Sequence, residues 1–393
     1  MLNCLNDVLN KKKRLAIGLM SGTSLDGIDA CLLEIEGNYV DSRIKVIDFL
    51  TLDYTGEEKE RILKLCNIKT STVDEICYMN TYLGNKMGQA AAAVCQKANI
   101  SISNVDFISS HGQTIHHMPD QNSTLQIGEL SNIAAVTGCI TVGDFRPSDM
   151  AYGGQGAPLV PYTDYILFSS KEKNRVLLNL GGIANVTVLK AAGKEEDVVA
   201  FDTGPANVLI DEIVKIITGG EMSFDDGGKL ALQGTIDDQW LYEILINDKY
   251  LLKKPPKSTG REYYTNEYAY CMYEWGRKRG LGNFDILATI TAYTAKSIQH
   301  QLNKFVLEKC KIDELYVSGG GAHNQMIMKL LSDYIDAEVK NINELYFSGD
   351  AKEAVAFAIL GNEFLSGRTN NIPNATGSDR KVIMGKLVLP TNN

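Results

Sequence analysis

Two segments of the chain, one near residue 22 and one near residue 181, share a layout that constrains the fold. Residues 14–20 (RLAIGLM) lead through the turn SGTS into DGIDACLLEIE, and residues 175–180 (RVLLNL) lead through Gly181-Gly182 into ANVTVLK. Short apolar runs bounded by glycine and serine indicate strands, so each segment predicts a β-hairpin with a polar tip. We therefore expect two α/β units, each beginning with such a hairpin.

The length of the chain fits two units. Its 393 residues exceed what one core usually supports, and 44% of them are hydrophobic. We expect a first unit of residues 1–145 plus about 367–393, and a second of residues 146–366. The pattern also predicts helices over 57–66, 72–98, 129–137, about 203–217, 323–335 and 350–365, mainly helix over 236–310, strands over 105–110, 124–127, 140–144, 198–202 and 314–318, and a Gly/Pro-rich loop over 145–161.

The charge and cysteine usage narrow the class of protein. The net charge is −9, and the one short basic run, Lys11–Arg14, is interpreted as the solvent-exposed start of a strand, so we expect no nucleic-acid partner. No hydrophobic run approaches the ~18 residues of a membrane span. The 8 cysteines are scattered without a C-x-x-C pair, which is typical of reduced thiols. These features predict a cytoplasmic protein without a membrane partner.

The tip of the first hairpin has the composition of an anion-binding turn. Ser21–Ser24 offer backbone N–H groups and three hydroxyls, and the glycine among them lets the main chain approach a ligand closely. Asp26 and Asp29 would repel a bare phosphate but not a phosphate that carries Mg²⁺. An ordinary hairpin turn explains the same residues equally well.

The second tip, Asn179–Asn185, has the same character, and two such tips favour a nucleotide bound between two units. The usual phosphate motifs, G-x-x-x-x-G-K-[ST] and G-x-G-x-x-G, are both missing from the sequence. A further glycine run, Gly319–Gly321, lies between a predicted strand and a predicted helix, followed by Asn324. It predicts contact with a nucleoside, with a tight strand-to-helix turn as the alternative.

The segment FDTGPAN brings an acidic residue to the end of a predicted strand. Ligands of open α/β sheets bind at the carboxyl ends of strands, so Asp202 is a candidate general base. Pro205 suits the first turn of a helix, and the alternative is that Asp202 or Thr203 only caps that helix.

Residues 109–158 form a polar set with several possible roles. His111, His116 and His117 lack the spacing of known zinc motifs, so His111 either donates a hydrogen bond to a substrate or is structural. Arg146 follows a strand and could bind a carboxylate with two N–H groups, or could pair with Asp144 or Asp149.

Ten ordered segments between about residue 14 and residue 365 together resemble the anhydro-N-acetylmuramic acid kinase family: GLMSGTSLDGIDA, SHGQTIHH, TLQIGE, GDFRPSDMAYGGQGAPLVPYTD, LNLGGIANVT, FDTGPAN, DGGKLALQG, PKSTGREYY, YVSGGGAHN and GDAKEAVAFA. The resemblance implies a two-lobed, actin-like ATPase fold with ribonuclease H-like lobes and a central nucleotide cleft. It also implies a homodimer.

The resemblance implies a reaction that uses ATP, Mg²⁺ and water and gives N-acetylmuramic acid 6-phosphate for peptidoglycan recycling. It makes Asp202 the base that activates water, and Asp26, in the loop that matches the family's phosphate loop, is the candidate magnesium ligand. The residues expected to bind the sugar are Arg146, Glu353, His111 and Gln126. The residues expected to bind ATP are Gly22, Thr23, Ser24, Leu25, Asp26, Gly27, Ile28, Asp29, Gly181, Gly182, Asn185, Gly204, Gly319, Gly320 and Asn324.

Three alternatives remain at the level of sequence. A kinase for the free hydroxyl of another amino sugar would need the same base. A nucleotide switch of the actin or Hsp70 type would hydrolyse ATP slowly without a sugar. A metal-dependent hydrolase built on the histidines would ignore ATP and lose its activity with a chelator.

Overall fold

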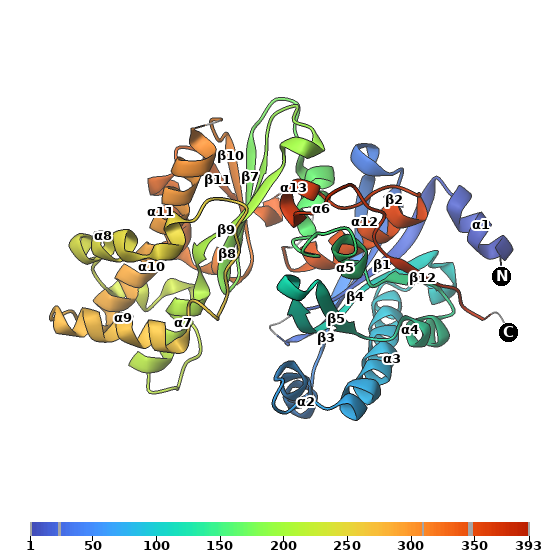
Figure 1. Ribbon diagram of the computed structural model, residues 1–393, viewed down its shortest axis with the longest axis horizontal. Helices are drawn as coiled ribbons and strands as arrows, with labels where there is room; N and C mark the ends of the chain where they lie inside the picture. The colour runs from blue at the N-terminus through green and yellow to red at the C-terminus, as the bar shows by residue number, and fades with distance from the viewer. Residues whose placement is uncertain (1, 23–24, 309, 345–348, 392–393) are drawn as a thin grey trace. The chain divides into compact units, whose positions relative to one another are not determined.

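The structure, a computed structural model, describes residues 2–22, 25–308, 310–344 and 349–391. The chain divides into two compact units (Figure 1). The first comprises Met1–Leu167 and Asp350–Asn393, and the second comprises Phe168–Gly349. Each unit has its own hydrophobic core. No helix in the described ranges is both long and apolar enough to cross a membrane.

The first unit is built on a 7-stranded sheet of order β12-β6-β4-β1-β2-β3, with β5 paired to β4. Its elements are α1 (Leu2–Asn10), β1 (Lys13–Ser21), β2 (Gly27–Glu36), β3 (Arg43–Asp53), α2 (Gly56–Cys66), α3 (Val73–Lys97), β4 (Phe107–Met118), β5 (Ser123–Ile127), α4 (Leu130–Thr137), β6 (Ile140–Gly143), α5 (Arg146–Met150), α6 (Val160–Phe168), α12 (Lys352–Leu365), α13 (Pro373–Thr376) and β12 (Lys386–Val388).

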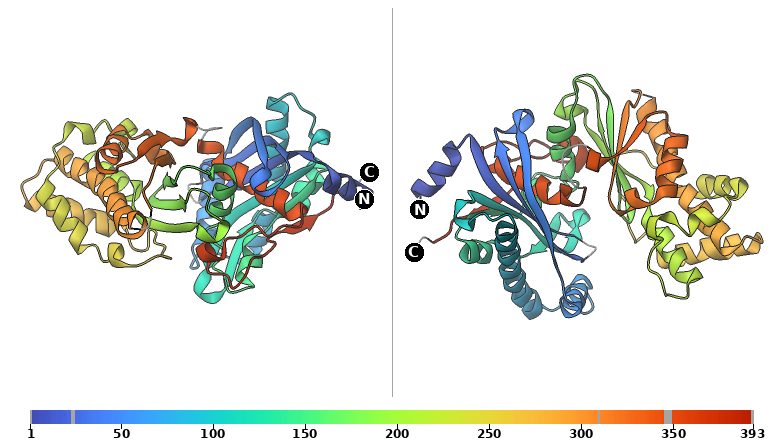
Figure 2. Two further views of the ribbon diagram at one scale, coloured as in Figure 1. Left: turned by 90° about the horizontal axis from the view of Figure 1, so that it is seen from above. Right: turned by 180° about the vertical axis from the view of Figure 1, so that it is seen from behind.

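Helices cover both faces of this sheet (Figure 2). Ile17 and Leu19 of β1 lie in a buried cluster with Leu83 and Met87 of α3. Gly18 points to the opposite face because side chains alternate along a strand. There α12 lies so close that a Cβ on Gly18 would be 1.8 Å from the carbonyl oxygen of Ala354. Glycine is thus required at this position for α12 to pack on β1.

The second unit is built on a 5-stranded sheet of order β11-β10-β7-β8-β9. Its elements are β7 (Arg175–Leu180), β8 (Ile183–Leu189), β9 (Val199–Pro205), α7 (Asn207–Ile217), α8 (Asp238–Asn247), α9 (Asn266–Lys278), α10 (Asn283–Leu302), β10 (Glu314–Ser318), α11 (Gln325–Tyr334) and β11 (Glu338–Asn341).

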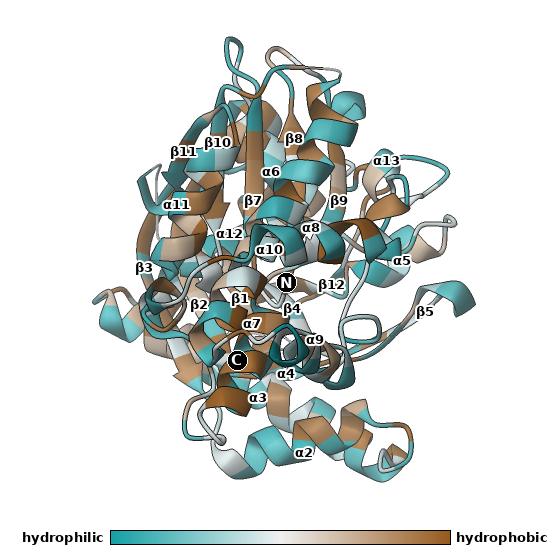
Figure 3. Cartoon of the chain, turned by 90° about the vertical axis from the view of Figure 1, so that its left-hand side faces the viewer, coloured by the Kyte–Doolittle hydropathy of each residue, from teal (hydrophilic) through white to brown (hydrophobic). Residues whose placement is uncertain are grey.

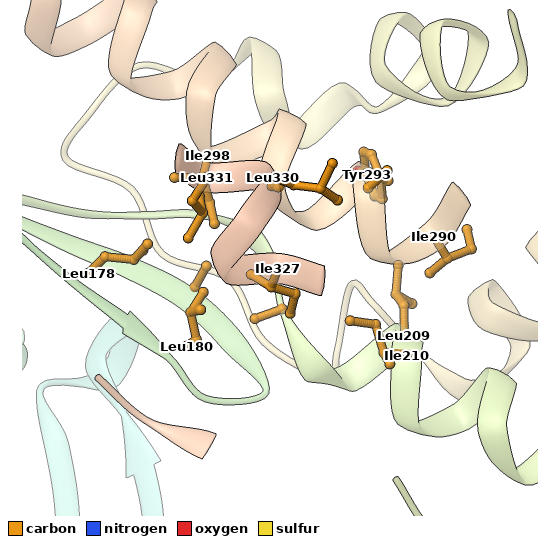
Figure 4. Packing of buried hydrophobic residues seen from close by; sticks show 14 of the residues in the cluster. Leu178, Leu180, Leu209, Ile210, Ile290, Tyr293, Ile298, Ile327, Leu330 and Leu331 are labelled. Carbon is orange, nitrogen blue, oxygen red and sulfur yellow. The ribbon is translucent and has the colours of Figure 1, made fainter. Parts of the chain in front are cut away.

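The core of this unit lies between the sheet and its helices. Leu178 and Leu180 of β7 lie on the side of the sheet where Ile327 and Leu331 of α11 pack (Figure 4). The strands β7 and β8 are correspondingly hydrophobic along much of their length, as the brown colour in Figure 3 shows. Continuous apolar strands of this kind need a helical layer to bury them, and α10 and α11 provide it.

Five strands of the first sheet have the same order and directions as the five strands of the second. In the first unit β1, β2 and β3 are antiparallel neighbours, and β4 and then β6 continue the sheet parallel to β1. In the second unit β7, β8 and β9 are antiparallel, and β10 and then β11 continue parallel to β7. This is the topology of a ribonuclease H-like unit, so the two α/β units expected from the hairpins and the actin-like fold implied by the family resemblance are confirmed. The nucleotide cleft stays a prediction.

The division of the chain differs from the expected one. Residues 146–167 and 350–366 pack with the first unit, not the second. The cause is packing that the order of the sequence does not reveal: α12 follows the second unit in the chain but rests on β1 and β4 of the first.

Most expected helices and strands are present, with several differences in their ends. β4 continues past Ser110 to Met118, where it pairs with β5. The expected loop over 145–161 contains α5, which begins at Arg146. β9 extends to Pro205, so α7 begins only at Asn207 and Pro205 belongs to the strand. The helix α1 and the strands β3, β11 and β12 had no counterpart in the sequence analysis.

Candidate functional site

Asp202 lies within β9, at a point where the pairing with β8 shifts. Asn185 pairs with Asp202, but Ala184 pairs with Gly204, so Thr203 is an extra residue in β9. Such a bulge bends a strand and redirects its side chains. The alternative that Asp202 or Thr203 caps α7 is wrong, because the residue before that helix, Ala206, has no side-chain cap and β9 separates Asp202 from it.

Three hydrogen bonds fix Asp202 from the outer edge of β9. Its backbone N–H donates to the carbonyl of Lys257 at 3.1 Å, and its carbonyl accepts from the Tyr250 hydroxyl at 2.9 Å. Its Oδ2 accepts from the backbone N–H of Thr259 at 2.9 Å. The second carboxylate oxygen, Oδ1, has no hydrogen-bond partner among the described residues. One oxygen of Asp202 is therefore held in place while the other remains able to accept a proton.

The surroundings of Asp202 favour its protonated form. Burial raises its pKa to about 6, with a further contribution from Glu262. The Thr259 N–H and the positive charge of Lys257 act in the opposite direction. A carboxylate with such a pKa is a stronger base than an ordinary aspartate and still ionised at neutral pH, which suits general base catalysis.

Asp202 belongs to a row of polar side chains across the second sheet. The strand registers align Ser318 with Asn179, Asn179 with Asn185, and Asn185 with Asp202. Residues in such register share one face of a sheet, and alternation along β7 puts that face opposite to the one where Leu178 and Leu180 pack. The row thus lies away from the layer of α10 and α11 and close to the tip of the β7–β8 hairpin.

The glycines of this tip are not explained by packing within the unit. A Cβ on Gly181 or Gly182 would come no closer than 3.7 Å to its described neighbours. Their carbonyls accept from the N–H groups of residues 206–208 at the start of α7, at 2.9 to 3.1 Å. Glycine at both positions leaves bare backbone at the tip, as close approach of a ligand would require.

In the glycine run Gly319–Gly321, the middle residue has more space around it than its two neighbours. Gly319 has φ +81, and a Cβ on Gly319 or Gly321 would lie within 2.6 Å of atoms of β7. A Cβ on Gly320 would have 4.0 Å to the nearest described atom. The turn therefore requires two of the glycines, and Gly320 remains the candidate for contact with a nucleoside.

Two other residues expected to bind ATP have local structural roles. Gly204 has φ +148, a conformation that side chains rarely adopt. Asn324 caps α11, since its Oδ1 accepts from the N–H groups of Met326 and Ile327 at 3.0 and 3.1 Å. Their roles toward a nucleotide stay predictions.

The tip of the first hairpin was expected to offer three hydroxyls to a ligand, but that of Ser21 is not available. Ser21 is buried, with its hydroxyl 2.6 Å from Gln113 Oε1 and 2.8 Å from the Tyr54 hydroxyl. The side chains of Leu25 and Ile28 lie in the hydrophobic core, so only their backbone could meet a ligand. Leu25 also has φ +57, an uncommon conformation for a bulky residue. Thr23 and Ser24 lie outside the described residues, and Gly22 and Gly27 flank the turn.

Asp26 and Asp29 remain the polar side chains of this tip. Asp26 is exposed. Asp29 Oδ1 accepts from the Thr51 hydroxyl across the sheet at 2.6 Å. Burial raises the pKa of Asp29, and the nearby negative charges of Asp350 and Asp26 add to this. Carboxylates that repel one another in this way would be stabilised by a cation.

Arg146 and His111 form a pair that the sequence did not predict. Nε and Nη2 of Arg146 both donate to Nε2 of His111, at 3.1 and 3.0 Å, and Nη1 donates to the Gly156 carbonyl at 2.6 Å. The Nδ1 of His111 is 2.9 Å from the Gly112 carbonyl, so Nδ1 carries the hydrogen and Nε2 accepts. The alternative, a pairing of Arg146 with Asp144 or Asp149, is wrong: Asp144 pairs with Lys386, and Asp149 accepts from other groups.

The pKa of His111 supports this assignment. Burial and the positive charge of Arg146 lower it to about 3, so the ring is neutral. With both ring nitrogens engaged, His111 has no free nitrogen for a substrate or a metal in this state. Arg146 itself stays charged, although burial lowers its pKa to about 10. Of its five N–H donors, three are used, which leaves two for a ligand.

Glu353 lies at the start of α12, where its charge interacts with Arg146 and Lys352. Its side chain is exposed to solvent, yet enough of the protein surrounds the carboxylate for burial to raise its pKa. Gln126 lies on β5, and its Nε2 donates to the hydroxyls of Thr114 and Thr124 at 3.2 and 2.8 Å, while its buried Oε1 has no partner among the described residues. The contact of either residue with a sugar stays a prediction.

Several residues of these sites were not singled out by the sequence. Tyr250, Lys257 and Thr259 around Asp202 come from a segment whose PKSTGREYY motif was recognised without a role. Asp149 accepts from the Gly156 N–H at 2.9 Å and so holds the carbonyl that binds Arg146. Among the described residues, no three His, Cys, Asp or Glu side chains form a group suited to a metal.

Comparison with known proteins gives the family. The family model described as anhydro-N-acetylmuramic acid kinase matches residues 14–390. The kinase of that name from Caldanaerobacter subterraneus subsp. tengcongensis is 44% identical over 391 residues, which is 97% of this chain and 98% of that protein. The one from Clostridioides difficile (strain 630) is 43% identical over 378 residues, covering 95% and 97% of the two chains.

Among solved structures, component A of (R)-2-hydroxyglutaryl-CoA dehydratase from Acidaminococcus fermentans is 12% identical, with a TM-score of 0.45 over 88% of this chain and 98% of that one. The sequence relatives, at 43% to 44% identity over nearly the whole chain, establish the family. The chain belongs to the anhydro-N-acetylmuramic acid kinase family.

Proposed function

We propose that this kinase opens the 1,6-anhydro ring of anhydro-N-acetylmuramic acid with water and phosphorylates O6 with ATP. The substrate has no free C6 hydroxyl, so O6 becomes an acceptor only when its bond to C1 breaks. The water oxygen bonds to C1, the C1–O6 bond breaks, O6 bonds to the γ-phosphorus, and ADP leaves. One water proton goes to the base, and the product is N-acetylmuramic acid 6-phosphate, an intermediate of peptidoglycan recycling.

The observation that carries this proposal is the asymmetric environment of Asp202. The Thr259 N–H holds Oδ2 at 2.9 Å, Oδ1 is left to accept a proton, and the pKa is raised to about 6. Water is a weak nucleophile, and a positioned base typically contributes about 10²–10⁴-fold to its attack. Asp202 is therefore assigned to deprotonate the attacking water.

Arg146 is assigned to the lactyl carboxylate of the sugar. His111 and the Gly156 carbonyl fix the plane of its guanidinium, and the two remaining N–H groups suit the two oxygens of a carboxylate. His111 acts through Arg146 and not by direct contact. Glu353 and Gln126 are assigned to the sugar's polar groups.

Gly181, Gly182 and Gly320 are assigned to the nucleotide, because their missing side chains are not explained by packing. Asp26 and Asp29 fit Mg²⁺, which is commonly bound by one or two carboxylates together with phosphates and water. Bound there, the ion would neutralise charge on the transferred phosphoryl group. Family membership decides against the nucleotide-switch alternative, since the relatives are named as kinases.

The test is a comparison of acceptors in an ATP-consumption assay with the purified enzyme. We expect ADP formation with anhydro-N-acetylmuramic acid and far slower formation with free N-acetylmuramic acid or with no sugar. Faster phosphorylation of the free sugar would support a kinase for an ordinary hydroxyl and overturn the proposed reaction. Equal ADP formation without sugar would overturn both the proposed reaction and the kinase for an ordinary hydroxyl.

A further inference from the structure

The segment that follows α8 forms hydrogen bonds with the outer edge of β9, all of them to Asp202. It begins with the 3-10 turn η7 (Lys249–Leu252) and continues to residue 259. Every hydrogen bond that fixes Asp202 from this side comes from it: the Lys257 carbonyl, the Tyr250 hydroxyl and the Thr259 N–H. An edge strand presents unpaired backbone groups, and this segment occupies them at Asp202.

The side chain of Lys257 attaches this segment to the core. Its Nζ donates to Oε1 of Gln301 on α10 at 2.7 Å and to the Tyr250 carbonyl at 3.3 Å. It also lies over the ring of Tyr250, 4.3 Å from the centroid. Gln301 is fully buried, and its Nε2 donates to the Leu251 carbonyl at 3.0 Å. The ammonium group of Lys257 is thus held by Tyr250 at the start of the segment and by Gln301 of α10.

We propose that Lys257 is a positioning residue for Asp202, holding the 257–259 segment against β9 so that Thr259 fixes Oδ2 and Oδ1 stays available for the proton. This inference rests on the proposed function, in which Asp202 is the base. Lys257 itself is assigned no contact with substrate or nucleotide. The role is specific to this lysine, because its carbonyl accepts from the Asp202 N–H while its Nζ donates to Gln301 and Tyr250.

The charge of Lys257 adds an electrostatic effect. It lowers the pKa of Asp202, against the raising effects of burial and Glu262. Lys257 in turn interacts with Lys304, Asp248, Asp202 and Lys253, and burial lowers its own pKa to about 8. Removing the charge should therefore raise the pKa of Asp202. The acid limb of kcat/KM should then move to higher pH.

The experiment compares Lys257→Met and Lys257→Gln with Lys254→Met, an exposed neighbour. Glutamine keeps an N–H donor for Gln301 and so preserves folding if methionine does not. We expect kcat of both Lys257 variants to fall about 10- to 100-fold, because small misplacements of a reacting group have effects of this size. KM for both substrates should stay within about twofold, and Lys257→Arg should restore the acid limb because it keeps the charge. Lys254→Met should match the parent enzyme.

Asp202→Asn separates this inference from the proposed function. If Asp202→Asn keeps near-normal turnover, the assignment of the base fails, whatever Lys257 does. If Asp202→Asn is inactive but both Lys257 variants keep kcat and the acid limb of the parent, only the inference is overturned. The double variant Asp202→Asn/Lys257→Gln should be no slower than Asp202→Asn alone, since Lys257 acts through the carboxylate. Additive losses would contradict this.

Discussion

Asp202 and Arg146 show how far single residues can be interpreted from sequence. Both were nominated by their position near strand ends. Their partners were not, because Thr259 is 57 residues and His111 is 35 residues away along the chain. The sequence offered the nearby Asp144 and Asp149 for Arg146, yet the fold directs these carboxylates to Lys386 and to the C-terminal segment. Partners that are distant in sequence follow from tertiary packing and not from local pattern.

Arg14 is a similar case in a structural role. It ends the basic run that was interpreted as solvent-exposed, yet it is 5% exposed and donates to the Val8 carbonyl and to Asn362 Oδ1. Lys11, Lys12 and Lys13 are exposed as expected. Charge composition alone did not distinguish the residue that joins α1, β1 and α12.

Replacement of Asp202 by asparagine tests the base directly. The variant keeps the shape of the side chain but cannot accept the proton, so kcat should fall by at least about 10²-fold. Binding of ATP and sugar, measured by calorimetry, should remain. Asp26→Asn serves as the control, and it should weaken the response of the rate to Mg²⁺. Near-normal turnover of Asp202→Asn would remove Asp202 from the mechanism.

The raised pKa of Asp202 predicts the pH dependence of the reaction. A base works only when deprotonated, so activity should be lost as the pH falls through the pKa. For the free enzyme, kcat/KM should have an acid limb near pH 6, because the pKa of Asp202 is raised to about 6 from 3.8. The rate profile of the parent enzyme between pH 4 and pH 9 is the measurement. A limb near pH 4 would mean that an ordinary carboxylate controls the rate.

Arg146 should bind the lactyl carboxylate of the sugar. Lysine offers a point charge and not a planar pair of donors, so Arg146→Lys should not restore recognition. We expect Arg146→Lys and Arg146→Ala to lower kcat/KM for anhydro-N-acetylmuramic acid much more than for anhydro-N-acetylglucosamine, which lacks the lactyl group. An equal loss for both sugars would show that Arg146 has another role.

At the scale of elements, the ends of strands and helices were the least predictable part. β9 runs through Thr203-Gly204-Pro205, where the sequence predicted the start of a helix. The bulge at Thr203 and the φ of Gly204 let the strand continue and redirect Asp202. Pairing with β8 sets the backbone conformation of Thr203–Pro205. The suitability of Pro205 for a helix start therefore did not determine the structure of this segment.

The C-terminal segment, which follows α12 from residue 366 onward, has a structural role that its composition did not indicate. Asn371 Nδ2 and the Thr376 hydroxyl both donate to Asp149 Oδ1 at 2.8 Å, while Asp149 Oδ2 accepts from the Gly156 N–H. The Gly156 carbonyl binds Arg146. The segment is therefore connected to the guanidinium through one buried carboxylate.

Thr376→Val tests this connection, with Thr376→Ser as the matched control. Valine keeps the shape but removes a donor to a buried carboxylate, which should lower the free energy of unfolding by about 1–3 kcal/mol. Because Gly156 is then less firmly held, KM for the sugar should rise while KM for ATP stays unchanged. Serine keeps the hydroxyl and should behave like the parent. Thermal melts and initial rates measure both effects, and a rise in KM for ATP instead would refute the connection.

At the scale of the whole molecule, the two hairpins correctly predicted two α/β units, each beginning with such a hairpin. The boundaries were wrong because α12 returns to the first unit after the second is complete. Gly18 permits this return, since a Cβ there would collide with the backbone of α12. A glycine within a hydrophobic strand gives no sign of which distant helix will pack on it.

The central claim is that water enters the sugar while ATP phosphorylates O6 of the same molecule. Incubation with ATP and anhydro-N-acetylmuramic acid in ¹⁸O-water, followed by mass spectrometry of the product, tests it. Preformed N-acetylmuramic acid 6-phosphate in ¹⁸O-water corrects for exchange at C1. The account predicts one ¹⁸O atom at C1 and none in the phosphate group. A 6-phosphorylated product without label at C1, or label in free phosphate in place of the sugar, would contradict it.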